Sequence, residues 1–384
     1  MAERTVVVLG GGTGGLVAAR SLRRRLDPTD RVVVIDRSPT YLFAPSLLWV
    51  MTGARRPEQL SADRHRLRRR GIEVLDAEVH DIDLTHRRVK TSDTEVAFDR
   101  LVIALGAELA PDALDGFTEA AHNIYTLDGA MAAAAALTRF DGGRLAIIVS
   151  SLPYKCPAAP YETAFLAEAL LRRRSVRDRT SIDLYTPEPA PMPTAGPVLG
   201  AALAAMLAER GITFHPNHTV ERIDAAAAEL VLGDGRRAGF DLLLGVPAHR
   251  APTVLASTGL PVANGFLPVD ATTLATSAEG VFALGDVTTI PVGGGKFLPK
   301  AGVFAEAQAK VIARNLAAEL TGKPGAARFD GAGACFVELG DGRAAFATGD
   351  FYAPDGPKIQ LRRPGRQWHL AKVAFEQYWM RRWP

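Results

Sequence analysis

Apolar runs of strand length alternate with helical segments along most of the chain. Residues 5–9 (TVVVL) form a continuous β-branched run, which is typical of a strand buried on both faces of a parallel sheet. A helical pattern over residues 16–26 follows it, and a second apolar run, residues 31–35, ends beside the acid Asp36. Because strands and helices alternate in this way, the sequence predicts an α/β fold with parallel sheets.

The turn after the first strand carries the glycine spacing of a dinucleotide-binding unit. Gly10, Gly12 and Gly15 form G-x-G-x-x-G between a predicted strand and a predicted helix. Gly10 permits the tight turn, Gly12 lets the backbone approach a pyrophosphate at the helix N-terminus, and Gly15 allows close packing of helix on strand. Asp36, 21 residues after Gly15, can accept hydrogen bonds from ribose hydroxyls. The complete unit predicts dinucleotide binding rather than a plain tight turn.

Composition and charge exclude several classes of protein. The chain has 384 residues, enough for two or three domains, and its 47% hydrophobic and 23% charged residues are an ordinary folded composition. A net charge of +3 is too balanced to indicate nucleic-acid binding. Two cysteines cannot form a disulfide scaffold, no apolar run approaches the ~18 residues of a spanning helix, and the first strand leaves no room for a signal peptide. We therefore expect a cytoplasmic protein of several domains that binds no nucleic acid.

Two later glycine turns resemble further FAD signatures of flavoproteins with two dinucleotide-binding domains. Residues 99–107 predict a strand that ends in a turn at Gly106, and residues 280–286 predict one that ends at Gly285 and Asp286. In those flavoproteins the acid binds the ribityl–pyrophosphate region, so the resemblance assigns this role to Asp286. A plain helix cap is the alternative.

A helix opens directly after these signatures, at residues 300–306, and continues to about residue 320. The same resemblance implies that its N-terminus, with Lys300 and Gly302, points at the pyrimidine edge of the flavin. The positive end of the helix dipole would stabilise charge on the reduced ring.

A second strand–helix unit lacks the glycines that nicotinamide binding requires. Residues 144–149 predict its strand, and residues 161–174 predict its helix. The turn between them, residues 150–160 (SSLPYKCPAAP), contains no glycine and three prolines, which lack a backbone donor. We expect this unit to keep the fold and to have lost nicotinamide binding.

A cysteine stands in place of the missing glycines. Cys156 lies next to Lys155 and just before a predicted helix N-terminus, and both features lower the pKa of a thiol and favour the thiolate. Cys335, 179 positions later, enters a predicted strand from a turn of small residues. The two cysteines are either a redox pair or unrelated buried hydrophobic residues, and the proline-rich turn favours the redox pair.

Five segments, in order along essentially the whole chain, resemble the sulfide:quinone oxidoreductase and flavocytochrome c sulfide dehydrogenase family. They are residues 10–15, 154–162 (YKCPAAPYE), 280–286, 300–306 and 335–340 (CFVELG). The resemblance implies that Cys156 and Cys335 are redox cysteines above the flavin. It also implies that Pro45, in the segment YLFAP, lies near the flavin ring.

The motifs and the resemblance together imply a set of FAD-binding residues. The set is Gly10, Gly12, Gly15, Asp36, Arg37, Pro45, Val79, Gly106, Gly285, Asp286, Lys300 and Gly302. Cytochrome-linked members attach FAD through a cysteine where this chain has none (residues 38–46), so we expect non-covalent FAD. No metal site is expected, because Pro216 separates His215 from His218 and no further ligand is near.

The resemblance implies FAD-dependent oxidation of sulfide, or of a related small thiol or persulfide, with a quinone as electron acceptor. Sulfide would attack a disulfide or polysulfide that joins the two cysteines and leave a persulfide on one of them. Glu162, Lys155 and Lys300 are candidates for tuning the charge, with a structural role as the alternative. Two other functions stay open: an NAD(P)H-dependent disulfide or quinone reductase, and a non-catalytic flavoprotein that senses persulfides or transfers electrons.

The expected architecture has two Rossmann-like domains and a C-terminal region. The FAD-binding domain is predicted at residues 1–106 and 265–322, the domain with Cys156 at 107–264, and the region with Cys335 at 323–384. That region ends in an aromatic helix, on which Trp368, Ala371, Phe375, Tyr378 and Trp379 share a face flanked by Lys372, Arg381 and Arg382. Tryptophan beside lysine and arginine predicts attachment to the cytoplasmic face of a membrane. Packing on the protein's own core or on a second copy in a homodimer is the alternative.

Overall fold

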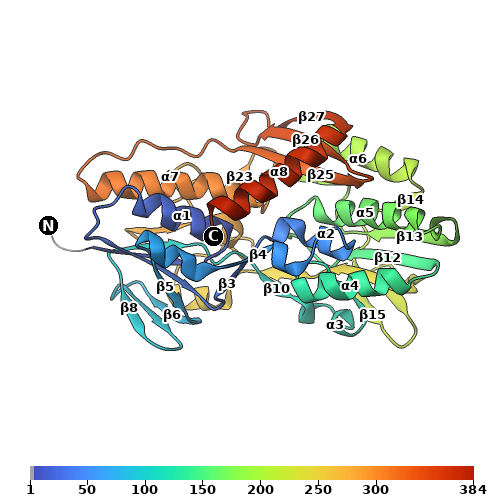
Figure 1. Cartoon of the computed structure of the whole chain (residues 1–384), viewed down its shortest axis with the longest axis horizontal. Helices are drawn as coiled ribbons and strands as arrows, with labels where there is room; N and C mark the ends of the chain where they lie inside the picture. Colours follow the sequence, from blue (N-terminus) through green and yellow to red (C-terminus); the bar gives the residue numbers. More distant parts are fainter. Residues whose placement is uncertain (1–3) are drawn as a thin grey trace.

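The computed structural model describes residues 4–384 as two parallel sheets and a C-terminal antiparallel sheet, each with helices packed on it (Figure 1). The first sheet is parallel throughout, in the order β21-β9-β1-β2-β5. Its strands are β1 (Thr5–Leu9), β2 (Arg31–Asp36), β5 (Glu73–Asp76), β9 (Arg100–Ile103) and β21 (Val281–Ala283). Alternate residues of β1 face opposite sides, so that Val6 and Val8 pack against one core and Val7 and Leu9 against another. Both faces are thus covered, as the continuous apolar run predicts.

Helices and a small antiparallel sheet cover the two faces of the first sheet. α1 (Thr13–Arg23) and α7 (Gly302–Leu320) lie side by side over one face (Figure 1). The other face packs against β6 (Val79–Asp83), β7 (Arg88–Thr91) and β8 (Glu95–Ala97). Short elements that connect this part are β3 (Thr40–Leu42), α2 (Leu47–Met51) and β4 (Ser61–Asp63).

The second sheet is also parallel, in the order β11-β18-β12-β13-β14. Its strands are β11 (His122–Asn123), β12 (Gly143–Val149), β13 (Thr180–Tyr185), β14 (Ile212–His215) and β18 (Leu242–Val246). One face packs against α4 (Leu127–Arg139), α5 (Ala159–Arg173) and α6 (Pro197–Glu209). The other face packs against α3 (Phe117–Ala120), β15 (Val220–Asp224), β16 (Glu229–Leu232) and β17 (Arg237–Gly239). The remaining short strands are β10 (Glu108–Ala110), β19 (Ala248–Arg250), β20 (Leu267–Pro268), β22 (Thr288–Thr289), β23 (Pro291–Val292) and β24 (Lys296–Phe297).

The C-terminal part contacts helices of both parallel sheets. β25 (Ala332–Gly340), β26 (Arg343–Asp350) and β27 (Lys358–Gly365) form an antiparallel sheet in which β25 packs along α5. α8 (Arg366–Arg382) runs from this sheet to the neighbourhood of α1 (Figure 1). There Arg20 donates to the carbonyl oxygen of Trp383 at 3.2 Å. The end of the chain thereby returns to its first helix.

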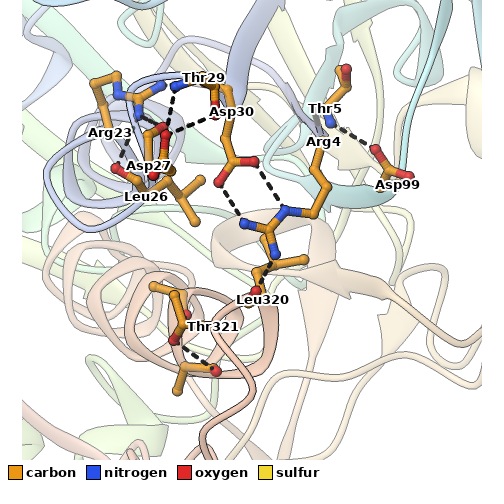
Figure 2. Close-up of polar contacts among 12 residues, drawn as sticks. Arg4, Thr5, Arg23, Leu26, Asp27, Thr29, Asp30, Asp99, Leu320 and Thr321 are labelled. Atoms are coloured by element: carbon orange, nitrogen blue, oxygen red, sulfur yellow. Dashed lines mark hydrogen bonds and ion pairs between the residues drawn. The ribbon is translucent and has the colours of Figure 1, made fainter. Parts of the chain in front are cut away.

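Figure 2 shows how α7 is tied to the beginning of the first sheet. Arg4 donates from Nε and Nη2 to the two carboxylate oxygens of Asp30, each at 2.9 Å, and it also donates to the carbonyl oxygen of Leu320. Thr5 donates its backbone N–H to Asp99 at 2.7 Å. Because these residues come from β1, the turn before β2, the turn before β9 and the end of α7, the contacts lock the returning helix onto the sheet.

The predicted fold class is confirmed, with shifts at two helix starts. α1 begins at Thr13 rather than at residue 16, because the glycines of the turn already adopt helical backbone. α5 begins at Ala159 rather than at residue 161, with Pro160 in the first turn, where a proline costs no hydrogen bond. The domain boundaries stay predictions; β21 supports the discontinuous first domain, because residues 281–283 pair with β9.

Candidate functional site

The turn after β1 is shaped so that only glycine fits at two of its positions. Gly10 has a φ of +92°, and a Cβ there would lie 2.4 Å from the carbonyl oxygen of Ala104. A Cβ on Gly15 would lie 1.8 Å from the carbonyl oxygen of Gly10. A Cβ on Gly12 would meet no atom within 4 Å, and α1 begins at the next residue without a side-chain cap. This open space at a helix N-terminus fits a pyrophosphate.

Asp36 lies at the end of β2, beside the glycine turn. It accepts from the backbone N–H of Gly11 at 2.6 Å and from that of Ser38 at 2.9 Å. Arg64, whose side chain is 4% exposed, forms an ion pair with Asp36 at 3.1 Å. The sequence did not reveal Arg64, because it opens an arginine-rich segment (residues 64–70) in which no spacing distinguishes it.

Arg37 and Val79 lie at the margin of this region. The Arg37 side chain is 73% exposed and pairs with Glu78 at 3.9 Å. Val79 is the first residue of β6 and is half-buried. Arg37 directly follows Asp36, and Val79 comes three residues after Asp76, the partner of Asp36 in the pairing of β2 with β5.

Gly106 and the Gly285–Asp286 pair follow the ends of β9 and β21, which are neighbours in the first sheet. Gly106 and Gly285 have φ values of +71° and +73°. Asp286 has a buried Oδ1 that finds no hydrogen-bond partner within residues 4–384. Burial raises the pKa of Asp286, and the nearby charges of Lys155 and Lys300 partly offset this effect. A buried acceptor without a partner fits a cofactor hydroxyl at this position.

Lys300 joins this region to the cysteine turn. Its Nζ donates to the carbonyl oxygens of Asp286 at 2.7 Å and Thr288 at 3.0 Å, and burial lowers its pKa to about 8. Its own carbonyl oxygen accepts from the N–H of Cys156 at 2.7 Å. Gly302 begins α7 two residues later, and a Cβ there would touch only Thr13. The cysteine turn is therefore held directly beside the N-terminus of α7.

Cys156 and Cys335, 179 positions apart in the chain, lie on neighbouring elements of the structure. Cys156 has a φ of +51° in the turn before α5, and Cys335 lies in β25, which packs along that helix. Burial is the largest effect on both thiols: it raises the pKa of Cys335 to about 12 and that of Cys156 further. The charge of Cys335 is among the effects that raise the pKa of Cys156.

The expectation that Lys155 and the helix N-terminus lower the pKa of Cys156 is wrong for this structure. Cys156 precedes α5 by three residues and is enclosed, so desolvation outweighs the helix dipole. The cation that lowers the pKa of both thiols is Lys372, and the anion that raises it is Glu162.

Glu162 and Lys372 form a buried ion pair of 2.7 Å between α5 and α8. The same Glu162 oxygen accepts from the backbone N–H of Glu338 in β25 at 2.7 Å. Lys372 also lies over the ring of Trp49, 5.1 Å from its centroid. Sequence analysis placed Lys372 at the flank of the aromatic face. Its spacing to Glu376, Trp379 and Trp383, in steps of three or four, is the signal that it shares their buried face.

The aromatic face of α8 divides into a buried and an exposed part. Trp379 is 2% exposed and donates from Nε1 to the hydroxyl of Tyr41 at 2.7 Å. Tyr378 is 51% exposed and Phe375 37% exposed. The single aromatic face predicted for α8 is therefore wrong, because Trp379 turns toward the core.

A second contact holds α8 against the segment that contains Pro45. Ser46 and Arg55 donate to the buried carboxylate of Glu376, at 2.5 Å and 2.8 Å. Pro45 itself is exposed, within the short helical turn Ala44–Ser46. Within the described residues, no three His, Cys, Asp or Glu side chains are arranged to hold a metal ion.

Comparison with known proteins places this geometry in a family. The family model of the pyridine nucleotide-disulphide oxidoreductases matches residues 4–309, which is most of the chain. The chain belongs to this family. Its members are FAD-binding oxidoreductases, and the glycine turn, the open helix N-terminus and the unpartnered Asp286 oxygen of this chain fit that cofactor.

Relatives within the family include sulfide-oxidising enzymes. The sulfide-quinone reductase of Aquifex aeolicus is 26% identical, over 98% of this chain and 90% of its own length. The mitochondrial sulfide:quinone oxidoreductase of Mus musculus is 24% identical, over 91% of this chain and 78% of its own. The X-ray structure of the Aquifex aeolicus sulfide:quinone oxidoreductase has a TM-score of 0.88 at 24% identity, over 98% of this chain and 90% of that one, which shows the shared fold.

The fold is shared with a solved structure of an NAD-dependent enzyme. An NAD-dependent persulfide reductase from A. fulgidus has a TM-score of 0.70 at 22% identity, over 90% of this chain and 64% of that one.

In the present chain a buried acid, Glu188, follows β13 of the second sheet. Glu188 accepts from the hydroxyls of Tyr154 at 2.9 Å and Tyr161 at 2.5 Å. One tyrosine of the proline-rich turn and one of α5 thus hold the carboxylate of Glu188 after β13.

Proposed function

We propose that this flavoprotein oxidises sulfide, or a related small sulfur species, through Cys156 and Cys335 and passes the electrons through FAD to a quinone. The observation that supports the proposal is that β25, which contains Cys335, packs along α5. The turn before α5 has no glycine and contains Cys156, which is hydrogen-bonded to Lys300 near the start of α7. Similarity to the sulfide-quinone reductase of Aquifex aeolicus over nearly the full length of both chains supports the choice of substrate and acceptor.

FAD would be held by the residues that line the two glycine-bearing edges of the first sheet. Gly10, Gly12 and Gly15 provide the pyrophosphate cradle, Asp36 accepts from a ribose, and Asp286 offers the unpartnered oxygen. Binding is non-covalent, because the segment around Pro45 offers no cysteine for attachment. When bound, FAD supplies a two-electron acceptor that a quinone can reoxidise.

The chain's own groups carry the sulfur chemistry. Hydrogen sulfide attacks a disulfide formed between Cys156 and Cys335. A sulfur–sulfur bond forms on one cysteine, the other leaves with the electron pair as a thiolate, and one proton is released. Lys372 provides the positive charge that favours this thiolate, while Glu162 opposes it and keeps Lys372 in place.

The NAD(P)H-dependent alternative is disfavoured by the end of the second sheet. The side chains of Tyr154 and Tyr161 bind the carboxylate of Glu188, which follows β13 where an acid would otherwise reach a ribose. A nicotinamide dinucleotide would have to displace these buried hydrogen bonds. No observation in the structure favours the non-catalytic electron-transfer alternative.

The outward face of α8 is the proposed route to the quinone. Leu370 is 64% exposed and Tyr378 51% exposed, and Arg381 and Arg382 follow them. Of the helices within residues 4–384, none has the length and apolar character to span a membrane. The exposed apolar side chains Leu370 and Tyr378 beside two arginines support our proposal that this face attaches to the cytoplasmic side of a membrane. The alternative is that a second copy of the chain covers the same face.

Sulfide-dependent reduction of a soluble quinone analogue tests the cysteine pair. Cys156→Ser and Cys335→Ser should each lower kcat on the order of 10³-fold or more, because each removes one sulfur of the disulfide. Both variants should retain FAD, measured by absorbance, since neither thiol is among the residues that would hold it. Quinone reduction at the wild-type rate in either variant contradicts the proposal.

A further inference from the structure

A chain of buried and half-buried titratable groups extends from the cysteines to the surface. Beyond the Glu162–Lys372 pair, Glu338 in β25 is 1% exposed and accepts from His369 in α8, with Nδ1 and Oε2 2.9 Å apart. The His369 side chain is 27% exposed and packs edge-on against Trp49. His369 is therefore the member of the chain that meets solvent.

The groups in this chain act on one another. The charged groups that face Glu338 are Glu162 from α5 and Lys372 and His369 from α8. Glu338 is tied to Glu162 through its backbone N–H, at 2.7 Å, and its Oε1 is buried with no hydrogen-bond partner among the residues that the structure describes. Glu162 and Glu338 together hold Lys372 in its charged form, although burial alone lowers the pKa of Lys372.

Charge counting identifies the group that holds a proton. Two buried carboxyls and one buried ammonium leave one unbalanced negative charge unless a proton is bound, and such a charge is costly away from water. Burial raises the pKa of Glu338, and the charge of Glu162 adds to that effect. Glu338, with an unpartnered oxygen and an imidazole at the surface beside it, is the carboxyl suited to take up and release this proton.

We propose that Glu338 and His369 form a proton-exchange pair, through which the proton released at the cysteine pair reaches solvent. The inference rests on the proposed function. When neutral hydrogen sulfide attacks the disulfide, a sulfur–sulfur bond forms to one cysteine, the disulfide breaks, and the other cysteine leaves as a thiolate. One of the two protons stays on the persulfide. Glu338 gives its bound proton to His369, from which it reaches solvent, and then takes up the proton released at the cysteine pair. Glu338 and His369 act through the neighbouring pair and are positioning residues.

Buffer rescue in the holoenzyme distinguishes proton exchange from a structural role. Sulfide is mixed anaerobically with wild type, His369→Asn and Glu338→Gln, and bleaching of the flavin is followed with and without added imidazole. Loss of the surface imidazole should slow bleaching by His369→Asn on the order of 10- to 100-fold, and imidazole should restore it. His215→Asn is the matched control, because His215 is 26% exposed and binds Asp183 at the same 2.9 Å. It should bleach at the wild-type rate.

A wild-type rate in His369→Asn, or a slow rate that imidazole does not restore, overturns the proposal. A second measurement needs no turnover: a pH titration by infrared spectroscopy should show a protonated carboxyl band in wild type that is absent in Glu338→Gln. Its presence in both proteins also overturns the proposal. If sulfide fails to bleach even wild type, the proposed function fails, while the infrared titration still decides whether Glu338 holds a proton.

Discussion

At the residue scale, opposite charges compete over the cysteine pair. Glu162 raises the pKa of both thiols and Lys372 lowers it, although the two groups are bound to each other at 2.7 Å. Desolvation adds to the effect of Glu162, so both thiols of the reduced protein stay protonated at neutral pH. Reactivity therefore depends on small changes in this balance of charge.

Neutralising each partner should shift thiol ionisation in opposite directions. Glu162→Gln removes the anion and should move the pH dependence of thiol alkylation in the reduced protein to lower pH. Lys372→Met removes the cation and should move it to higher pH. Each variant leaves one buried charge without its ion-pair partner, so we expect the free energy of unfolding to fall by about 3–5 kcal/mol. The double variant should recover most of that loss. Shifts of the same sign would contradict this assignment.

The residues of the candidate site could be predicted from sequence only where they belong to a recognisable motif. Gly10, Gly15 and the turn at Cys156 were found because glycine widens and proline narrows the choice of backbone conformation, and their spacing shows this in the sequence. Arg64 and Glu338 were missed, because their partners come from distant segments. Burial of Cys156 reversed the expected pKa shift for the same reason: the sequence shows neighbours along the chain but not the elements that cover them.

At the element scale, α8 contacts elements that pack on both parallel sheets. Its inward side contributes Trp379 to the core and Glu376 to a contact with Ser46 and Arg55. Its outward side exposes Leu370 and Tyr378. Helical periodicity predicted that α8 is amphipathic, but the choice of inward side depended on polar partners that sequence does not show.

Trp379→Ala should destabilise the protein by about 3–5 kcal/mol, because it leaves a cavity and removes the hydrogen bond to Tyr41. Leu370→Ala, on the exposed side of the same helix, should change the free energy of unfolding by less than about 0.5 kcal/mol. Denaturant titration of both variants measures the difference. Equal losses would mean that the assignment of inward and outward sides is wrong.

At the scale of the whole molecule, the candidate site is formed by segments that are far apart in the sequence. β21 brings Asp286 to the first sheet, α7 begins beside the cysteine turn, and β25 carries Cys335 to α5. The resemblance of residues 280–286 to an FAD signature implied the first return. The approach of β25 to α5 was implied only by family resemblance, since no local pattern encodes it.

Attachment through the outward face of α8 predicts binding to vesicles. Wild type should float with anionic phospholipid vesicles, and Leu370→Gln combined with Tyr378→Gln should largely abolish this, because both side chains are removed from the apolar contact. Sulfide-dependent flavin bleaching by the double variant should be unchanged. A wild type that stays with the soluble fraction and elutes as a dimer would assign the face to a second copy of the chain.

The most direct test of the account is an anaerobic titration of the purified flavoprotein, first with sulfide and separately with NADH, while the flavin spectrum is recorded. We predict rapid bleaching by sulfide and none by NADH. The proposed function assigns reduction of the flavin to Cys156 and Cys335, and the hydrogen bonds of Tyr154 and Tyr161 to Glu188 disfavour binding of NADH. Bleaching by NADH without bleaching by sulfide would contradict the account and favour the NAD(P)H-dependent reductase.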